Sequence, residues 1–243
     1  MLEWYRFMKG RIFLNKQKLY RIGFYLLALL ILALGLELNS KTGLGVSPII
    51  SIAYSTSVLF QINFPDMTLI LYIVFVLAEM IIHAFRKENK TRLILDALQL
   101  PLSIVFTRFM HVFEDVIPDY TALSGTFFGT MPGRIILLLV AITFTGIGAA
   151  MSLNMHIIPN PGDGIVQAIA ECVHKKVGFT KNCVDAVCIL MSTAISLCFI
   201  GHLEGVAIGT FIAMIGTGRC IALFNYLTKE KLNEACGLAT DCL

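Results

Sequence analysis

The sequence predicts an all-α polytopic membrane protein that forms a single membrane domain over residues 1–243. Two observations support this prediction: the composition is strongly apolar, and the apolar residues gather in six long stretches and two short ones. Of the 243 residues, 57% are hydrophobic and only 14% are charged, with a mean hydropathy of +0.79. Soluble domains have about 45–50% apolar and about 25% charged residues. The same composition excludes disordered, coiled-coil and disulfide-rich chains.

Six stretches are long enough to cross the hydrocarbon core, which takes roughly 20 mostly apolar residues. They cover approximately residues 22–40, 67–85, 93–113, 134–154, 183–200 and 205–227. The first stretch follows a basic segment, as the apolar region of a secretory signal does. Its apolar run over residues 22–36 is too long for a signal, and no small-residue cleavage site follows it. We therefore expect a permanent first span.

Two further stretches, residues 48–60 and 161–173, are apolar but only 13 residues long. As helices they would reach roughly 20 Å, because the rise is about 1.5 Å per residue, and the core is roughly 30 Å thick. They are therefore either two additional tilted spans or two re-entrant half-helices. The distribution of basic residues distinguishes these two arrangements.

Basic residues favour the re-entrant arrangement. With six spans and two re-entrant segments, the amino terminus, residues 86–92, residues 175–181 and the carboxyl terminus all face the cytoplasm and hold 15 of the 19 Lys and Arg residues. Loops that carry Lys and Arg stay on the cytoplasmic side. Residues 114–133, which are acidic and contain no Lys or Arg, then face outward. Eight full spans would instead place the basic residues 86–92 outside.

The chain also contains an internal repeat. A shift of 113 residues aligns residues 21–77 with the second half without a gap. Each half reads as a long span, a break, a proline-started short helix and two more long spans. Three full spans per repeat is an odd number, so the second repeat, about 134–227, would be inverted relative to the first, about 21–113. Inverted repeats with broken helices are typical of secondary transporters and some channels. The matching pairs include Arg21 with Arg134, Ala28 with Ala141, Gly35 with Gly148 and Pro48 with Pro161.

Two motifs resemble a known family. Residues 42–48 (Thr-Gly-Leu-Gly-Val-Ser-Pro) and 158–167 (Ile-Pro-Asn-Pro-Gly-Asp-Gly-Ile-Val-Gln), with the glycine-rich last span over residues 205–218, resemble the YitT/YczE-type family of bacterial integral membrane proteins. The resemblance covers residues from about 20 to 227. It implies a multi-pass protein of the bacterial inner (plasma) membrane, and it supplies neither a substrate nor functional residues.

The starts of the two short helices are the first candidate site. Ser47-Pro48 and Asn160-Pro161 occupy equivalent repeat positions, and each pair is typical of a helix N-cap followed by proline. Asp163 is placed to reach back to the Asn160 N–H. Free N–H groups at a helix start inside the bilayer suit a polar or anionic ligand. The alternative is that both helices only fill space in the fold.

We expect these two starts to meet near the bilayer midplane and to line one polar cavity, with Glu79 and Asp185 on flanking helices. The substrate-binding candidates are Ser47, Ser51, Asn160, Asp163 and Gln167.

Polar side chains also recur on one face of several spans. Under the 113-residue shift the second and fifth spans are polar on the same face, where Tyr72, Glu79 and His83 match Asp185, Ser192 and Ser196. The third span has polar residues at helical spacing, namely Asp96, Gln99, Ser103 and Thr107.

Ionisable groups inside a membrane are costly and usually face the bundle or a water path. A structural ion pair, such as Arg108 with Glu79, explains them equally well, and Arg108 could instead extend toward the outer interface. The candidates for ion coupling or ion pairing are Glu79, Asp185, Arg108 and Arg219.

The motifs of other protein classes are missing from the sequence. It has no catalytic, nucleotide-binding or metal-ligand motif, so we expect neither an enzyme nor a cofactor or metal. The seven cysteines, all between residues 172 and 242, are expected to be free buried thiols. The basic amino terminus is expected to contact anionic lipid rather than nucleic acid.

The leading functional hypothesis is a secondary transporter that moves a small polar or anionic solute by rocking one repeat against the other. Glu79, Asp163 or Asp185 would carry a coupling proton or cation. The alternatives are an aquaporin-like passive channel and a membrane scaffold or accessory protein without transport. The expected partners are the lipid bilayer, the solute and the coupling ion, and a homo-oligomer is compatible with the sequence.

Overall fold

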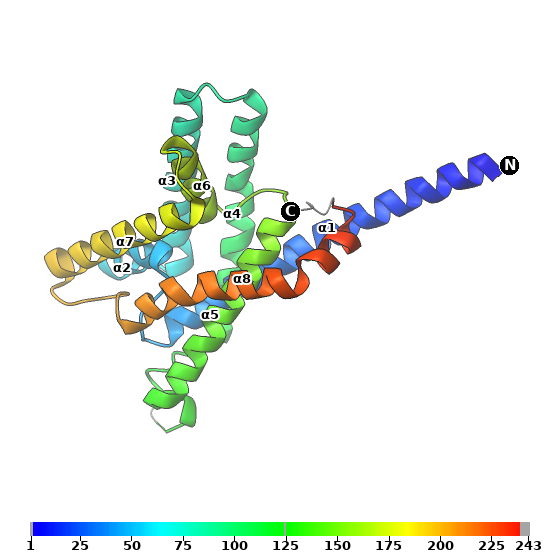
Figure 1. The fold of residues 1–243 in the computed structure, drawn as a ribbon. Coiled ribbons are helices and arrows are strands. Elements are labelled where there is room, and N and C mark those ends of the chain that lie inside the picture. The colour runs from blue at the N-terminus through cyan, green and yellow to red at the C-terminus, as the bar shows by residue number, and fades with distance from the viewer. Residues whose placement is uncertain (1, 124, 239–243) are drawn as a thin grey trace.

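The computed structural model describes residues 2–123 and 125–238, and within them all regular structure is helical (Figure 1). The eight α-helices are α1 (Leu2–Lys41), α2 (Ser51–Phe60), α3 (Phe64–Phe85), α4 (Lys90–Val116), α5 (Met131–Asn154), α6 (Pro161–Cys172), α7 (Val177–Ile195) and α8 (Ile208–Cys236). A 3-10 turn, Pro48–Ile50, leads into α2, and a second one, Phe127–Gly129, precedes α5. A π-helical turn, Ser196–Ile200, extends α7.

Six helices are apolar and long enough to span a membrane, as the sequence predicted. These segments have 22 to 29 residues each: Lys16–Lys41, Phe64–Phe85, Lys90–Val116, Met131–Asn154, Val177–Ile200 and Ile208–Cys236. The chain therefore has the architecture of a polytopic membrane protein. The last helix continues nine residues beyond the predicted span, because the polar residues that end an apolar run do not end a helix.

The outer faces of these helices carry many exposed large apolar side chains, including Phe85, Leu190, Ile208, Ile215 and Leu227. Such a surface suits lipid, since large exposed apolar patches are rare on soluble monomers.

The cysteines are divided between the core and the outer faces of the helices, so the expectation that all are buried is wrong. Cys188 and Cys236 are buried, whereas Cys172, Cys183 and Cys198 are exposed free thiols. Cys242 lies outside the described residues.

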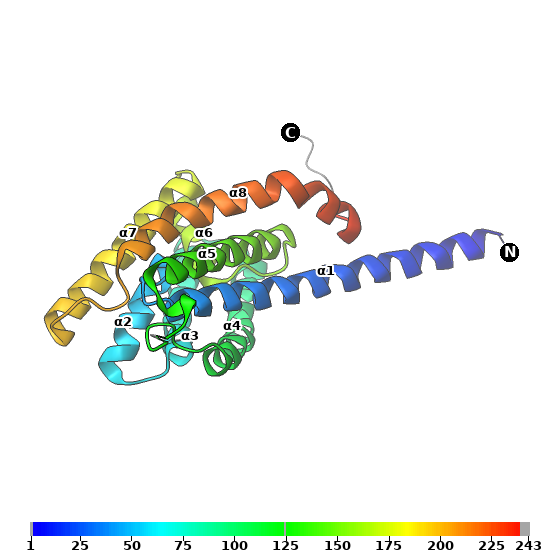
Figure 2. The same ribbon diagram turned by 90° about the horizontal axis from the view of Figure 1, so that it is seen from below.

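Helices α1 and α5 make the most extensive contact in the fold and run alongside each other (Figure 2). Glycines allow this close approach. A β-carbon on Gly35 would lie 2.5 Å from the Thr145 backbone nitrogen, and one on Gly148 would lie 2.5 Å from the Leu32 backbone nitrogen. Small residues at such crossings let two backbones pack directly, which favours helix association in membranes.

The ends of the same two helices are joined by two matching hydrogen bonds. Arg21, near the start of the apolar part of α1, donates its Nε to the Met155 carbonyl oxygen at 2.6 Å, just beyond the end of α5. Arg134, near the start of α5, donates its Nε to the Thr42 carbonyl oxygen at 2.6 Å, just beyond the end of α1. The start of each helix therefore lies beside the end of the other, so α1 and α5 are antiparallel.

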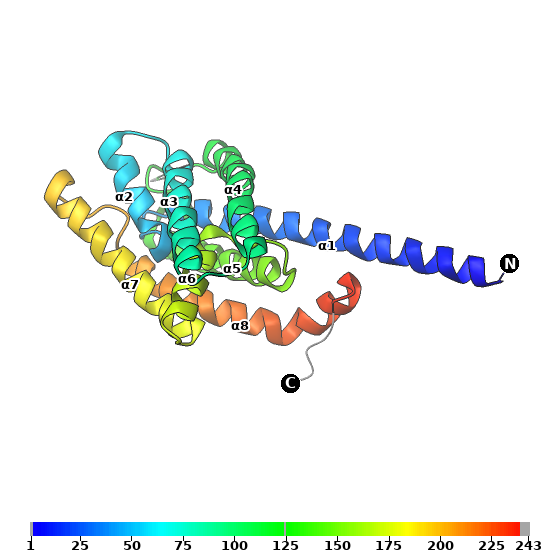
Figure 3. The ribbon, with the colours of Figure 1, turned by 90° about the horizontal axis from the view of Figure 1, so that it is seen from above.

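The remaining helices surround this pair. Helices α3 and α4 form a hairpin (Figure 1), and α6 lies against α3 (Figure 3). The short helix α2 packs on both α3 and α7, and α8 packs on α5.

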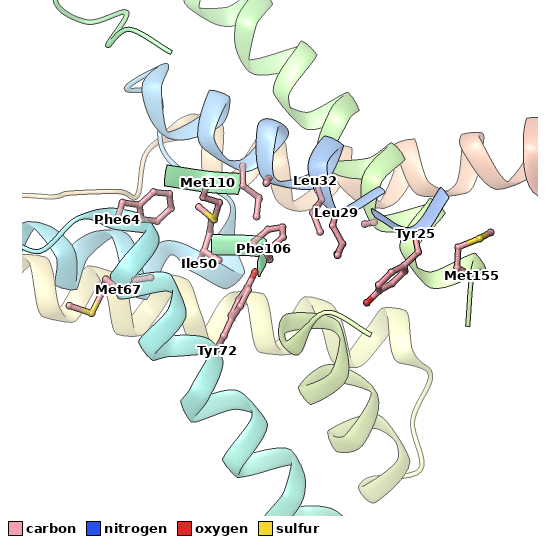
Figure 4. Packing of buried hydrophobic residues seen from close by; sticks show 14 of the residues in the cluster. Tyr25, Leu29, Leu32, Ile50, Phe64, Met67, Tyr72, Phe106, Met110 and Met155 are labelled. Atoms are coloured by element: carbon pink, nitrogen blue, oxygen red, sulfur yellow. The ribbon is translucent and has the colours of Figure 1, made fainter. Parts of the chain in front are cut away.

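A continuous core cluster joins α1 to the α3–α4 hairpin (Figure 4). In this cluster Tyr72 of α3 points toward Phe106 of α4, with ring centroids 5.9 Å apart. The cluster also contains Tyr25, Leu29, Leu32, Ile50, Phe64, Met67, Met110 and Met155.

Candidate functional site

The two short helices begin beside each other. A β-carbon on Gly162, in the first turn of α6, would lie 3.4 Å from Ile49 Cγ1, in the turn that leads into α2. Asn160 caps α6, since its side-chain oxygen accepts a hydrogen bond from the Gly162 N–H at 3.1 Å. The sequence thus placed the two starts correctly as neighbours, and their depth in the membrane stays a prediction.

Two of the predicted capping contacts differ in the structure. Ser47 precedes a 3-10 turn and makes no side-chain capping hydrogen bond. Its backbone is extended, and α2 itself begins only at Ser51, so the helical N–H groups that a cap would satisfy lie farther along the chain. The Asp163 carboxylate contacts the Lys181 ammonium of α7, with Oδ1 and Nζ 4.0 Å apart, instead of closing a capping box on Asn160.

A small cavity of about 40 Å³, called the central cavity below, lies between the two starts. Three of the five predicted substrate-binding residues line it: Ser47, Asn160 and Asp163. Lys181 and Tyr72 also line it, from α7 and α3. The cavity therefore combines hydroxyl, amide, carboxylate and ammonium groups beside two helix starts. Lys181 is not among the predicted site residues. Residues 175–181 are predicted from the sequence to form a basic cytoplasmic loop, whereas the structure places Lys181 in α7.

The other two predicted residues lie elsewhere. Ser51 belongs to a buried hydroxyl cluster between α2 and α7 and donates to the Pro48 carbonyl oxygen at 2.7 Å. Ser192 donates to the Ser51 carbonyl oxygen at 3.1 Å, and Ser55 bonds to the Glu204 carbonyl oxygen at 2.9 Å. These hydrogen bonds give Ser51 a structural role in helix packing.

Gln167 lines a larger cavity of about 220 Å³ at the carboxyl end of α5. We call this the α5-end cavity, and Glu79, Arg92, Asp96 and His156 also line it.

A third cavity, of about 100 Å³, lies at the carboxyl end of α1 and is called the α1-end cavity. Because α1 and α5 are antiparallel, the two end cavities lie at opposite ends of that helix pair. They also use equivalent repeat positions, since a shift of 113 residues converts Tyr54 and Gly43 of the α1-end cavity into Gln167 and His156 of the α5-end cavity.

The acidic coupling candidates occupy different environments. Glu79 is buried, accepts a hydrogen bond from Gln99 Nε2 at 2.9 Å and lines the α5-end cavity. His83 Nδ1 and Asp96 Oδ2, one turn farther along the same hairpin, lie 2.7 Å apart. Asp185 is buried in α7, and its Oδ1 has no hydrogen-bond partner within the described residues. Neither Glu79 nor Asp185 lines the central cavity itself.

The ion pair between Arg108 and Glu79, considered above as an alternative to a functional site, does not form. In the antiparallel α3–α4 hairpin, Glu79 lies near the turn beside Gln99, whereas Arg108 lies more than two turns farther along α4. Arg108 is also exposed, because it follows the buried Thr107 and is rotated about 100° away from the buried face. Arg219 is exposed on α8 as well, so neither arginine neutralises a buried acid.

These features define a class: an all-helical, polytopic membrane protein in which a short helix and the turn before another begin beside a polar cavity. The chain belongs to the family described as "Family of unknown function (DUF6198)", whose model matches residues 19–226. That match does not link the chain to the YitT/YczE-type family by name. No curated protein and no solved structure matches the chain significantly.

Proposed function

We propose that this chain is a secondary transporter that moves a small polar or anionic solute across the bacterial inner membrane. In this proposal six spans and two re-entrant half-helices, α2 with its preceding turn and α6, form two inverted repeats. Both termini face the cytoplasm, where the basic segments of the chain are retained.

Repeated contacts support the inverted repeats. The hydrogen bond from Arg21 to Met155 and the one from Arg134 to Thr42 join positions that the 113-residue shift exchanges. Ile49 and Gly162 are themselves equivalent positions and lie beside each other in the wall of the central cavity, as two residues do beside a two-fold axis. Because α1 and α5 are antiparallel, such an axis runs across them and lies in the membrane plane if they cross the bilayer.

The central cavity is the observation on which the transport proposal rests. The turn that leads into α2 and the N-terminal end of α6 meet there, and Lys181 adds an ammonium group beside the Asp163 carboxylate. Helix N-termini and an ammonium group favour anionic or hydrogen-bond-accepting solutes. Transporters of several folds bind their substrates at such half-helix ends.

The sizes of the cavities favour alternating access over an open pore. A cavity needs a volume of roughly 10–15 Å³ to hold one water molecule. The central cavity of about 40 Å³ therefore holds only water-sized groups in this conformation. A solute would enter only after the two repeats move apart on one side. The end cavities at equivalent repeat positions are the natural paths from either side.

A binding screen followed by a flux measurement tests this proposal. Purified protein is heated with a panel of polar and anionic metabolites, since a ligand that binds the folded state raises the Tm. The best compound is then supplied in labelled form to proteoliposomes that contain the same compound unlabelled inside. A transporter accumulates label transiently by exchange, whereas a channel only equilibrates it. No binding and no flux for any compound would favour the scaffold role.

A further inference from the structure

We propose that Glu79, His83 and Asp96 bind a single divalent first-row transition-metal ion. The three side chains lie in the α3–α4 hairpin, outside the central cavity. This proposal rests on the geometry and charge of the hairpin and does not require that the chain transports a solute.

The three residues converge in a buried place. Each offers a ligand atom within 4.8 Å of the other two, and none is more than 2% exposed. Bonds from Zn²⁺ to nitrogen or oxygen are roughly 2.0–2.2 Å, so ligands around one ion lie roughly 3–4 Å apart. Small side-chain rotations therefore suffice to close the site.

The groups are held by two neighbouring helices. Glu79 and His83 are four residues apart on α3 and share a helix face. Asp96 faces them from α4 across a short turn, with its Oδ2 2.7 Å from His83 Nδ1. Gln99 Nε2 donates to Glu79 Oε2 at 2.9 Å and orients that carboxylate, as outer-shell groups do in metal sites.

Unpartnered atoms indicate that the cluster is incomplete without a ligand. His83 Nε2 and Gln99 Oε1 are buried and have no hydrogen-bond partner among residues 2–123 and 125–238. Buried polar atoms nearly always have one. A metal ion and its bound water supply partners for a free imidazole nitrogen and an amide oxygen.

Charge leads to the same conclusion. Glu79 and Asp96 are two acids in a buried position, and buried charges are stable only when they are compensated. A protonated His83, with Nδ1 2.7 Å from Asp96 Oδ2, would compensate only one of the two. The nearest arginine in the adjoining cavity, Arg92, contacts Glu171 at 3.3 Å instead. A divalent cation would neutralise both carboxylates. The α5-end cavity of about 220 Å³ contains Glu79 and Asp96 in its wall and gives an ion a way in.

The ligand types favour a transition metal. Mg²⁺ and Ca²⁺ prefer oxygen ligands alone, whereas a histidine nitrogen with carboxylates suits Zn²⁺, Mn²⁺, Fe²⁺ or Co²⁺.

The other repeat provides a comparison within the same chain. Its equivalents of the three ligands are Ser192, Ser196 and Gly209. Helix α6 has a glycine beside the proposed metal site. A β-carbon on Gly164 would lie 2.5 Å from Glu79 Oε2, so a larger residue there would collide with that carboxylate. The corresponding position in the other repeat is Ser51, within the hydroxyl cluster. The site is therefore a feature of the α3–α4 hairpin and not of both repeats.

Metal binding is measured on the full chain in detergent, purified without a polyhistidine tag and stripped with a chelator. Zn²⁺ and Mg²⁺ are titrated by calorimetry, and Co²⁺ by its visible absorption bands. We expect about one Zn²⁺ or Co²⁺ per chain, because the part of the chain that the structure describes holds one such buried set of ligands, and no binding of Mg²⁺. His83→Gln and Asp96→Asn should each weaken Zn²⁺ binding roughly tenfold or more.

His111→Gln is the matched control. His111 also contacts carboxylates, Asp66 at 2.8 Å and Glu114 at 3.6 Å, but it is partly exposed at another place in the fold. This variant should bind Zn²⁺ as the wild type does. If His83→Gln does not fold, Glu79→Gln keeps the size of the side chain and tests the same site. The proposal is overturned if the wild type binds no Zn²⁺, or if His83→Gln, Asp96→Asn and Glu79→Gln all bind it normally. Since no flux is measured, these outcomes are separate from failure of the transport proposal.

Discussion

Lys181 Nζ lies 4.0 Å from Asp163 Oδ1, so an ammonium group on α7 faces a carboxylate in the first turn of α6. Both side chains are partly exposed to the central cavity. A pair of this kind contributes little to stability, typically up to about 1 kcal/mol, because water screens it. Because the pair lies in the wall of the central cavity, we expect it to matter more for the proposed solute binding than for folding.

The first prediction concerns Asp163→Asn. This change keeps the size of the side chain and removes its charge. If Asp163 couples a cation to transport, driven uptake should be lost while the protein still inserts and folds, with an unfolding free energy lowered by no more than about 1 kcal/mol. Uptake in proteoliposomes and the Tm in detergent measure the two effects. Normal driven uptake by well-folded Asp163→Asn would contradict the coupling role. The control is Asp66→Asn, because Asp66 forms a partly exposed pair with His111 elsewhere in the fold.

The second prediction concerns topology. Residues 86–92 should face the cytoplasm, together with both termini, and residues 114–133 should face outward. A single cysteine at Asn89 in a cysteine-free background should therefore resist a membrane-impermeant thiol reagent in intact cells, and a cysteine at Asp119 should react. Labelling of Asn89→Cys from outside would instead support eight full spans.

The third prediction concerns the close contact of α1 and α5. Gly148→Ala should lower the unfolding free energy by about 1–3 kcal/mol, because the new β-carbon meets the backbone of α1 at 2.5 Å from the Leu32 nitrogen. Gly23→Ala is the matched control, since nothing lies within 4 Å of its β-carbon position. Alanine favours a helix by up to about 1 kcal/mol over glycine, so this variant should be neutral or stabilised. Equal Tm values for the two variants would argue against the contact.

Much of the fold is predictable because lipid is the solvent. The spans follow from apolar length alone, and the 113-residue shift pairs Gly35 with Gly148 before any contact is known. The neighbouring starts of α2 and α6 are expected from the same shift if a two-fold axis relates the two halves, because equivalent residues such as Ile49 and Gly162 then lie close together beside that axis.

The side-chain partners were not predictable in the same way. They depend on how each helix is rotated and on the register of each hairpin, which hydropathy does not fix. Thus Arg108 faces outward, and Glu79 pairs with Gln99 instead. The polar stripes of the second and third spans did contain a signal for the Glu79–His83–Asp96 cluster, since a short turn places the facing stripes of two consecutive spans against each other.

The last prediction tests directly whether the starts of the two short helices lie side by side. Ile49→Cys and Gly162→Cys in a cysteine-free chain should form a disulfide on mild oxidation, because a β-carbon at position 162 lies 3.4 Å from Ile49 Cγ1. Disulfides need β-carbons roughly 3.5–4.5 Å apart, a separation that these helix starts can reach. The pair of Ile49→Cys with Gly178→Cys is the control, since position 178 has no neighbour within 4 Å. Protease cleavage between the repeats followed by a non-reducing gel detects the link.

The same cross-link also tests the transport proposal. If transport requires the two starts to separate, the linked protein should lose uptake, and a reductant should restore it. Failure to cross-link would refute the contact itself, whereas full uptake by the linked protein would show that the starts stay together during transport.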